Sequence, residues 1–247
     1  MITDNLILCF IPARGGSKRI PEKNLQLLNG KPLISYTIKS AMQSHVFDRI
    51  IVSSDDERIL KLSRELMAGI DQRPENLSDD TIKAVDVVME YLIRTKAERE
   101  FKYVALMLPT CPFKTVDDIK NAVKLFEKQG DSSGSLITVT SYDFPPQLAL
   151  TFLNKSSCKL AMREPAQYLK TTRSQDISKT YHPNGALYIT SIIKFLKEKT
   201  FFTEPLFGYC MPEERSFDID YTYQLKIADS YMRWLQDESS YETKCRF

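Results

Sequence analysis

Histidine is scarce in this chain of 247 residues, occurring only at His45 and His182. Neither lies in a recognisable nucleophile motif, so the run Ser53-Ser54-Asp55-Asp56 is not interpreted as a nucleophilic serine beside an acid. The five cysteines are odd in number, widely scattered and without a C-x-x-C pair. They predict neither a disulfide framework nor a zinc site, and a reduced, cytoplasmic location is expected.

Long apolar runs and a large charge excess are also missing. No apolar run approaches the roughly 20 residues that span a bilayer, and the stretch 6–11 is too short for a signal-peptide core. The net charge of +2 is too small for a general binder of nucleic acids or membranes. Small-molecule substrates are therefore expected, with neither nucleic acid nor membrane as a partner.

Short apolar runs alternate with amphipathic segments along most of the chain, a pattern typical of α/β proteins. Strands are expected at 6–11, 49–53, 103–108, 135–140 and 185–190, and helices at 32–44, 57–67, 84–95, 116–128, 192–199 and 221–236. This alternation predicts a Rossmann-like, mostly parallel sheet with helices on both faces. Residues 144–183 are irregular and proline-containing, so we expect one domain, 1–247, with an inserted arm at about 144–183.

The segment Ile11 to Asn24 is rich in glycine and basic residues and directly follows the first expected strand. In open α/β sheets, ligands bind beyond the carboxyl ends of strands. Gly15 and Gly16 allow backbone amides to approach an anion closely. The segment carries a local charge of +3, which suits a triphosphate, although a solvated basic turn is the alternative interpretation. Neither a Walker loop nor a G-x-G-x-x-G fingerprint is present.

Asp218 and Asp220 flank Ile219 just before the last expected helix. In extended backbone, residues two apart point the same way, so both carboxylates can face one point. Such hard oxygen ligands suit Mg²⁺, or Mn²⁺, at a nucleotide site. The alternative is capping of the helix N-terminus by acidic residues.

The motif I-P-A-R-G-G-S-K-R-I-P-x-K-N closely resembles the N-terminal signature of the acylneuraminate cytidylyltransferases, which include synthetases of CMP-sialic, CMP-legionaminic and CMP-pseudaminic acids. Further matches follow in family order and cover nearly the whole chain, namely Gly30-Lys31-Pro32-Leu33, Val52 to Asp56, Arg73-Pro74, Leu77-Ser78-Asp79-Asp80, Pro109-Thr110, Pro183-Asn184-Gly185-Ala186 and Asp218-Ile219-Asp220. The 3-deoxy-manno-octulosonate cytidylyltransferases share the fold but lack the Gly-Gly-Ser-Lys run.

The resemblance implies a role for each group of matching residues. It implies that Arg14, Lys18 and Lys23 bind the triphosphate and that Asp218 and Asp220 bind the metal. The remaining nucleotide-binding residues that it implies are Ala13, Gly15, Gly16, Ser17, Asn24, Arg73, Asp80 and Thr81. Tyr188, Phe201 and Phe202 resemble an aromatic wall around the acylated sugar, although plain core packing is the alternative for the two phenylalanines. Asn184-Gly185 could equally be only a turn.

Departures from the sialate-specific members fall on the sugar side. Leu108 stands where glutamine is common, Cys111 where serine is usual, and His182 where arginine is usual. The segments around Gln147 and Arg173 look closer to members that activate pseudaminic or legionaminic acids. The sequence-based expectation for sugar contacts is therefore Leu108, Gln147, Arg173, His182, Tyr188, Phe201 and Phe202.

The resemblance implies transfer of CMP from CTP to the anomeric hydroxyl of a nonulosonic acid with release of pyrophosphate, for cell-surface glycan synthesis. It also implies a homodimer in which the arm reaches the sugar site of the other subunit, with Arg173 as a candidate contact. Two alternatives stay open from the sequence. One is a nucleotidyltransferase for deoxy-octulosonate or a hexose 1-phosphate, and the other is a non-catalytic nucleotide-binding or nucleic-acid-binding protein.

Overall fold

A computed structural model gives the fold, and it describes residues 5–79, 81–129, 134–154, 156–170, 173 and 177–244. Seven strands form one sheet in the order β11-β7-β10-β6-β1-β4-β5. These strands are β1 (Ile7–Pro12), β4 (Arg49–Ser54), β5 (Gly69–Gln72), β6 (Tyr103–Leu106), β7 (Ser135–Ser141), β10 (Tyr181–Ser191) and β11 (Leu206–Cys210). All pairings are parallel except those of β10, which runs antiparallel to both β6 and β7. The predicted mostly parallel α/β sheet is confirmed.

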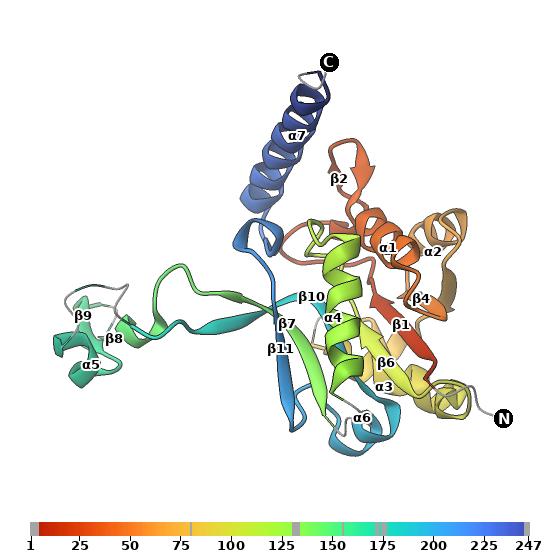
Figure 1. The fold of residues 1–247 in the computed structure, drawn as a ribbon, viewed down its shortest axis with the longest axis horizontal. Helices are drawn as coiled ribbons and strands as arrows, with labels where there is room; N and C mark the ends of the chain where they lie inside the picture. Colours follow the sequence, from red (N-terminus) through yellow and green to blue (C-terminus); the bar gives the residue numbers. More distant parts are fainter. Residues whose placement is uncertain are drawn as a thin grey trace.

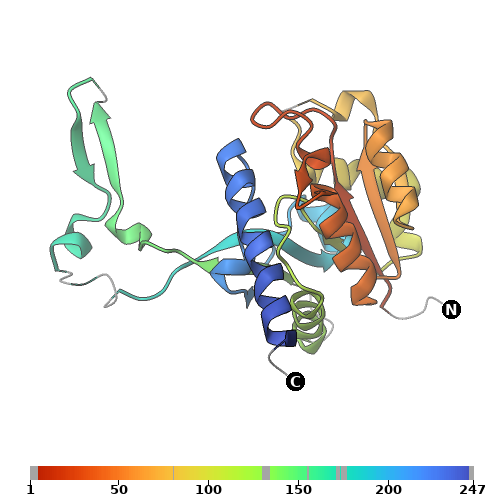
Figure 2. The same ribbon diagram turned by 90° about the horizontal axis from the view of Figure 1, so that it is seen from above.

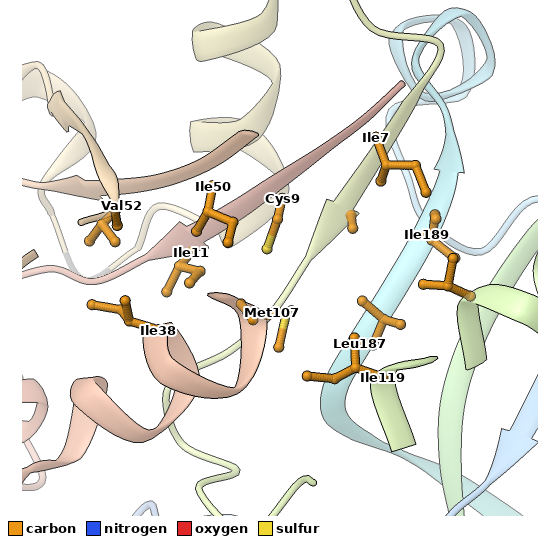
Figure 3. Packing of buried hydrophobic residues seen from close by; sticks show 14 of the residues in the cluster. Ile7, Cys9, Ile11, Ile38, Ile50, Val52, Met107, Ile119, Leu187 and Ile189 are labelled. Atoms are coloured by element: carbon orange, nitrogen blue, oxygen red, sulfur yellow. The ribbon is translucent and has the colours of Figure 1, made fainter. Parts of the chain in front are cut away.

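Helices cover both faces of this sheet (Figures 1 and 2). One face packs against α1 (Leu33–Ser44), α2 (Glu57–Glu65) and α4 (Val116–Lys128), and the other against α3 (Ala84–Thr95) and α6 (Ile192–Glu198). Strand β1 divides its side chains between the two faces. Ile7, Cys9 and Ile11 enter the first core (Figure 3), and Leu8 and Phe10 enter the second. A strand covered on both faces reads as a continuous apolar run, and this is why β1 is apolar throughout.

Two further units project from this body. Between β7 and β10 the chain forms an arm with a hairpin of β8 (Leu150–Asn154) and β9 (Lys159–Met162), followed by α5 (Pro165–Lys170), and the arm lies away from the sheet (Figures 1 and 2). The long helix α7 (Thr222–Lys244) closes the fold and contacts the short hairpin of β2 (Leu27–Leu28) and β3 (Lys31–Pro32). Helix α7 extends eight residues beyond the predicted end at 236.

The Pro-Asn-Gly motif does not form a connecting turn. Pro183, Asn184 and Gly185 lie inside β10, where the register with β7 shifts between Pro183 and Tyr188. Gly185 has a φ of +77°, and a Cβ there would lie 3.2 Å from the Leu108 side chain. Glycine is therefore required by the conformation of this bulge. In the part of the chain that the structure describes, no helix is both long enough and apolar enough to cross a membrane.

Candidate active site

The cleft lies where the carboxyl ends of β1, β4 and β6 meet. Along the sheet, β5, β4, β1 and β6 follow the 3-2-1-4 order of the Rossmann fold, and its ligands bind beside the strand at which the order reverses. A cleft of about 660 Å³ opens at this point. Its walls include most of the predicted nucleotide and metal residues and one predicted sugar residue, Leu108. The nucleotide and metal residues are Arg14, Gly16, Ser17, Lys18, Lys23, Asn24, Arg73, Thr81, Asp218 and Asp220.

The basic loop after β1 is closed at its base by hydrogen bonds. The Ala13 amide donates to the Ser53 carbonyl at 2.9 Å and continues the pairing of β1 with β4. The Asn24 side chain donates from Nδ2 to the carbonyl of Arg14 at 2.8 Å. Ala13 is fully buried, so its side chain serves packing. The Gly15 amide donates to Asp55 Oδ1 at 2.8 Å, and Gly15 lines a hollow behind the loop.

Two loop cations reach across the cleft to Asp220. Lys23 Nζ donates to Asp220 Oδ1 at 2.9 Å and to the Ile219 carbonyl at 3.1 Å. Arg19 donates to Asp220 Oδ2 at 2.8 Å, and its guanidinium lies over the Tyr221 ring at 5.1 Å. Burial alone would raise the pKa of the Asp220 carboxyl, but the hydrogen bonds and charges of Lys23 and Arg19 outweigh it and lower that pKa. Sequence reasoning counted the charge of Arg19 without placing it in the site.

Asp218 occupies a different electrostatic environment from Asp220. Burial raises the pKa of its carboxyl, and the negative charge of Asp220 adds to this effect, whereas a hydrogen bond from Thr110 opposes it. The Ile219 amide donates to the Thr110 carbonyl at 2.9 Å, so the acidic segment is fixed to the loop that follows β6. With Ile219 fully buried between them, both carboxylates line the cleft, as the i, i+2 spacing predicts.

Two hard carboxylates beside a nucleotide cleft fit Mg²⁺. No group of three or more possible metal-ligating side chains occurs within residues 5–79, 81–129, 134–154, 156–170, 173 and 177–244. Mg²⁺ needs no such group, because it is commonly held by one or two carboxylates and completes its shell with substrate phosphates and water. Asp218 and Asp220 therefore fit Mg²⁺, provided that a polyphosphate supplies further oxygen ligands.

The far end of the cleft contains a buried arginine. The Arg73 side chain is only 6% exposed and donates to the Ser53 carbonyl at 2.8 Å. Burial lowers the pKa of its guanidinium, and the nearby charges of Asp55 and Asp71 oppose this. Among the described residues, its Nε atom is buried without a hydrogen-bond partner. Thr81 also lines this end, and the predicted nucleotide residue Asp80 lies outside the described residues.

An apolar hollow of about 250 Å³ adjoins the cleft and shares Ala84 and Leu108 with it. Tyr188, Phe201 and Phe202 line this hollow, with ring centroids 6.0 and 6.2 Å from Tyr188 to the two phenylalanines. Phe202 is half exposed, whereas Phe201 is 1% exposed and belongs mainly to the core. Burial raises the pKa of Tyr188 to about 12, so its hydroxyl stays protonated at neutral pH.

The other predicted sugar residues lie elsewhere in the chain. Gln147 and Arg173 belong to the arm, and neither lines the cleft or the apolar hollow. His182 lies at the start of β10, where its ring packs against Tyr142 with centroids 4.7 Å apart. The fold therefore brings Leu108, Tyr188, Phe201 and Phe202 together and leaves Gln147, Arg173 and His182 apart from them.

Two buried polar side chains that sequence reasoning missed organise the segments around Asp218. Asn184 donates from Nδ2 to Ser216 Oγ at 2.9 Å, and its Oδ1 accepts from Thr138 at 2.7 Å and from the Ala186 amide at 3.1 Å. It thus joins β7 and β10 to the loop that carries Asp218. In the sequence, an asparagine followed by glycine is also typical of a turn. Only its burial shows that Asn184 is instead a hydrogen-bonding residue of the interior.

Lys114 is the second such residue. Its Nζ is buried and donates to Thr37 Oγ1 at 2.8 Å and to the carbonyls of Leu108 and Cys111 at 2.9 and 2.7 Å. These bonds hold the turn after β6 that contains Thr110, the partner of Asp218. The only feature of the sequence that could have indicated this role is the position of Lys114 directly after the run Pro-Thr-Cys-Pro-Phe.

The model of the family described as "Cytidylyltransferase" matches residues 8–233, which include the basic loop, the acidic pair and part of α7. The chain belongs to the cytidylyltransferase family. A pseudaminic acid cytidylyltransferase of Campylobacter jejuni is 35% identical over 223 residues, 90% of this chain and 94% of the relative. An N-acylneuraminate cytidylyltransferase of Streptococcus agalactiae is 31% identical over 86% of this chain and 50% of the relative.

A solved structure of CMP:2-keto-3-deoxy-manno-octonic acid synthetase complexed with CTP aligns with this cytidylyltransferase at a TM-score of 0.68. The alignment covers 93% of this chain and 99% of the other, at 14% identity. At that identity the likeness concerns the fold, which the two chains share. The family that the motifs indicated and the α/β fold are thus both confirmed.

Proposed function

We propose that this cytidylyltransferase transfers CMP from CTP to the anomeric hydroxyl of a nonulosonic acid and releases pyrophosphate. The observation that carries the proposal is the arrangement of the cleft, in which the cations of the basic loop face Asp218 and Asp220 across a space of nucleotide size. The relatives' names support the acceptor class, because they join cytidylyl transfer to pseudaminic and N-acylneuraminic acids. We place the reaction in the cytoplasm, where the free cysteines Cys9, Cys111, Cys158 and Cys210 would stay reduced.

The triphosphate would lie along the basic loop. Arg14, Lys18 and Lys23 line the cleft and would neutralise the phosphate charge so that an oxygen nucleophile can approach the α-phosphorus. Arg73, which lines the far end of the cleft, would lie at the nucleoside end. The sugar oxygen forms a bond to the α-phosphorus, the bond to the bridging oxygen breaks, and the hydroxyl proton is released. Positioning of the two substrates supplies much of the acceleration.

Asp218 and Asp220 would hold Mg²⁺ at the phosphate end of the cleft. When bound, this ion would polarise the α-phosphate and favour ionisation of the attacking hydroxyl. Lys23 and Arg19, which now pair with Asp220, would then turn to phosphate oxygens. The Lys23 side chain in particular is mostly buried, with 15% of it exposed, and would lie within reach of both Asp220 and the triphosphate.

The sugar would lie over the apolar hollow beside the cleft. Leu108, Tyr188 and Phe202 present apolar surface and one protonated hydroxyl there. Such a surface favours a sugar with acyl or deoxy substituents over one with hydroxyls alone, because buried hydroxyls without partners are unfavourable. We therefore expect pseudaminic or legionaminic acid to be a better acceptor than deoxy-octulosonic acid.

The direct test measures pyrophosphate release with Mg²⁺ while CTP, UTP and GTP are compared, each with sialic, legionaminic, pseudaminic and deoxy-octulosonic acids. Lys23→Ala and Asp218→Asn are each expected to lower kcat by at least about a hundredfold with the fold preserved. Lys61→Ala and Glu65→Gln on the exposed side of α2 are the matched controls and should behave as wild type. Near-normal pyrophosphate release by both cleft variants would overturn the proposal, and a preference for UTP or GTP would reassign the nucleotide.

We further propose that the protein is a homodimer in which the arm covers part of a second copy. Apolar side chains of the β8–β9 hairpin are 36–63% exposed, namely Leu150, Phe152, Leu153, Leu160 and Met162. A two-stranded hairpin is marginally stable alone, so an arm of this composition is expected to pack on another surface. This would also bring Arg173 to the partner's sugar site.

The oligomeric state can be measured by analytical ultracentrifugation. Wild type is expected to sediment as a dimer, and Phe152→Ser with Leu160→Ser as a monomer with weaker sugar binding. Ile193→Ser, an equally exposed apolar position on α6, is the control and should leave the dimer intact. A monomeric and fully active wild type would contradict this part of the proposal.

A further inference from the structure

The acidic motif Asp55-Asp56 directly follows β4 and contacts the back of the basic loop. Asp55 Oδ1 accepts a hydrogen bond of 2.8 Å from the Gly15 amide, 40 residues earlier in the chain. Asp56 caps the N-terminus of α2 by accepting from the Arg58 amide at 2.9 Å. Helix α2 thereby fixes the Asp56 carboxylate beside the loop, and Asp55 directly precedes this cap.

The contact between the loop and this motif is close enough to exclude any side chain at Gly15. A Cβ built there would lie 2.7 Å from Asp56 Cβ and 2.9 Å from Asp56 Oδ2. By contrast, a Cβ on Gly16 would meet nothing within 4 Å. The first glycine of the pair is thus required by packing on Asp56, and the second glycine is not.

The other end of the loop is held by an arginine of the same helix. Arg58 Nη2 forms ion pairs with Glu22 at 2.8 Å and with Asp56 at 2.7 Å, and Arg58 Nε donates to Asp56 at 3.1 Å. Glu22 has a left-handed φ of 50°, which a non-glycine residue adopts at a cost in energy. Arg58 therefore supports the loop at the residue where its backbone turns.

Between these two points the loop has space on both sides. Gly16 and Ser17 line the nucleotide cleft and also line a separate hollow of about 600 Å³ behind the loop. Ile20, further along the loop, is buried in a core cluster with Ile219. Among the described residues, Gly16 and Ser17 lie between two hollows, so their position depends on the attachments on either side of them. Flexible phosphate-binding loops bind weakly, since ordering them on binding reduces the net affinity.

We propose that Asp55, Asp56 and Arg58 are positioning residues that hold the basic loop in the shape that receives the triphosphate. This inference rests on the proposed function for the identity of the nucleotide, but the attachment itself concerns only the polyphosphate. Asp55 fixes the start of the loop at Gly15, and Arg58 fixes its end at Glu22. Lys18 and Arg19, which line the cleft, lie between these two attachments and are thereby positioned before nucleotide arrives.

Charge and geometry make opposite predictions for Asp55, and this makes the inference testable. A carboxylate near a triphosphate site repels the ligand, so its removal should tighten polyphosphate binding if charge alone matters. If the carboxylate holds the loop, its removal should weaken binding. Asp55→Asn removes the charge and keeps an oxygen that can accept from the Gly15 amide, whereas Asp55→Ala removes both. Glu57→Ala removes a charge from the same hollow without a loop contact, because Glu57 pairs with Arg64, and serves as the matched control.

The experiment is calorimetric titration of the full chain with CTP, inorganic tripolyphosphate and cytidine. For Asp55→Ala we expect the Kd for CTP and for tripolyphosphate to rise about tenfold, the usual effect of losing one hydrogen bond to a charged group, with the Kd for cytidine unchanged. Asp55→Asn and Glu57→Ala are expected to bind as wild type or more tightly. Tighter polyphosphate binding by Asp55→Ala, or equal weakening by Asp55→Asn, would overturn the inference.

Further variants separate a loop effect from a general loss of structure. Arg58→Ala and Gly15→Ala should weaken tripolyphosphate binding in the same direction, while thermal unfolding reports whether each variant is folded. If wild type binds tripolyphosphate but does not prefer CTP, the nucleotide assignment fails and the role of Asp55 is still decided by tripolyphosphate. If Asp55→Ala lowers thermal stability with no change in any Kd, the residue is merely structural and the inference is wrong.

Discussion

Replacing Lys114 by methionine tests how the turn below Asp218 is built. The ammonium group is fully buried, and burial lowers its pKa from 10.5 to about 8, with the charge of Asp218 among the smaller opposing effects. The unfolded chain therefore binds a proton more readily than the folded protein between pH 8 and 10.5. Stability contributed by Lys114 must then rise with pH across this window and be constant below it.

Lowering the pKa of Lys114 from 10.5 to about 8 changes the pH-dependent part of the unfolding free energy by about 3 kcal/mol in total. About 2 kcal/mol of this change should occur between pH 7 and 9.5. At neutral pH the variant loses three hydrogen bonds but also removes a buried charge, so its net destabilisation should be small. As the pH rises, the difference in unfolding free energy should move in favour of wild type. Burial raises the pKa of Cys111 from 9.0 to about 11, so its thiol also changes stability with pH, but both proteins contain it and its effect largely cancels in the difference.

The assay is urea unfolding followed by far-ultraviolet circular dichroism at pH 7, 8, 9 and 9.5 for wild type and Lys114→Met. Circular dichroism is preferable to fluorescence, because the single tryptophan, Trp234, is half exposed and lies on α7. Groups outside the site titrate in both proteins and cancel in the difference. A difference in unfolding free energy that stays flat, or falls, between pH 7 and 9.5 would refute the reasoning.

Two further predictions concern residues that fix the loop before Asp218. Asp118 is 3% exposed and accepts two hydrogen bonds from the Arg215 guanidinium, at 2.9 and 3.0 Å. Asp118→Ala should therefore lower the unfolding free energy, measured by urea titration, by about 3 kcal/mol. A loss below about 1 kcal/mol would contradict a supporting role. Asn184→Ala removes three hydrogen bonds, although Ser216 and Thr138 keep others. We expect about 2 kcal/mol of destabilisation and a lower kcat with little change in the KM for CTP. Steady-state kinetics would decide this, and an unchanged kcat would show that Asn184 does not position the Asp218 segment.

The strands that sequence patterns located best are those buried on both faces. The expected strands at 6–11, 49–53 and 135–140 and the helices at 84–95 and 116–128 match β1, β4, β7, α3 and α4 within a residue. Their signal is strong because each carries several apolar residues at the spacing of its element. Edge strands have a weaker apolar pattern. Strand β5 has a single apolar side chain, Ile70, and β11 contains a central glycine, so the sequence predicted neither strand.

The length of β10 was underestimated for a related reason. Proline, asparagine and glycine normally interrupt a strand, and here they lie at a bulge within it. Asn184 is only 3% exposed and is hydrogen-bonded to two other segments of the chain. Such bonds join residues far apart in sequence and leave no local pattern. The same reason explains why Arg19 and Lys114 were not assigned site roles, since their partners lie 201 and up to 77 positions away.

The pairing of Arg19 and Lys23 with Asp220 has a consequence for the protein before it meets any ligand. A cleft lined by several cations and two carboxylates would otherwise hold like charges in close proximity. Here Arg19 and Lys23 lie 2.8 and 2.9 Å from the Asp220 carboxylate and offset its charge. The polypeptide thus balances these charges with its own side chains, whereas small domains whose folding depends on a metal need the ion to do so.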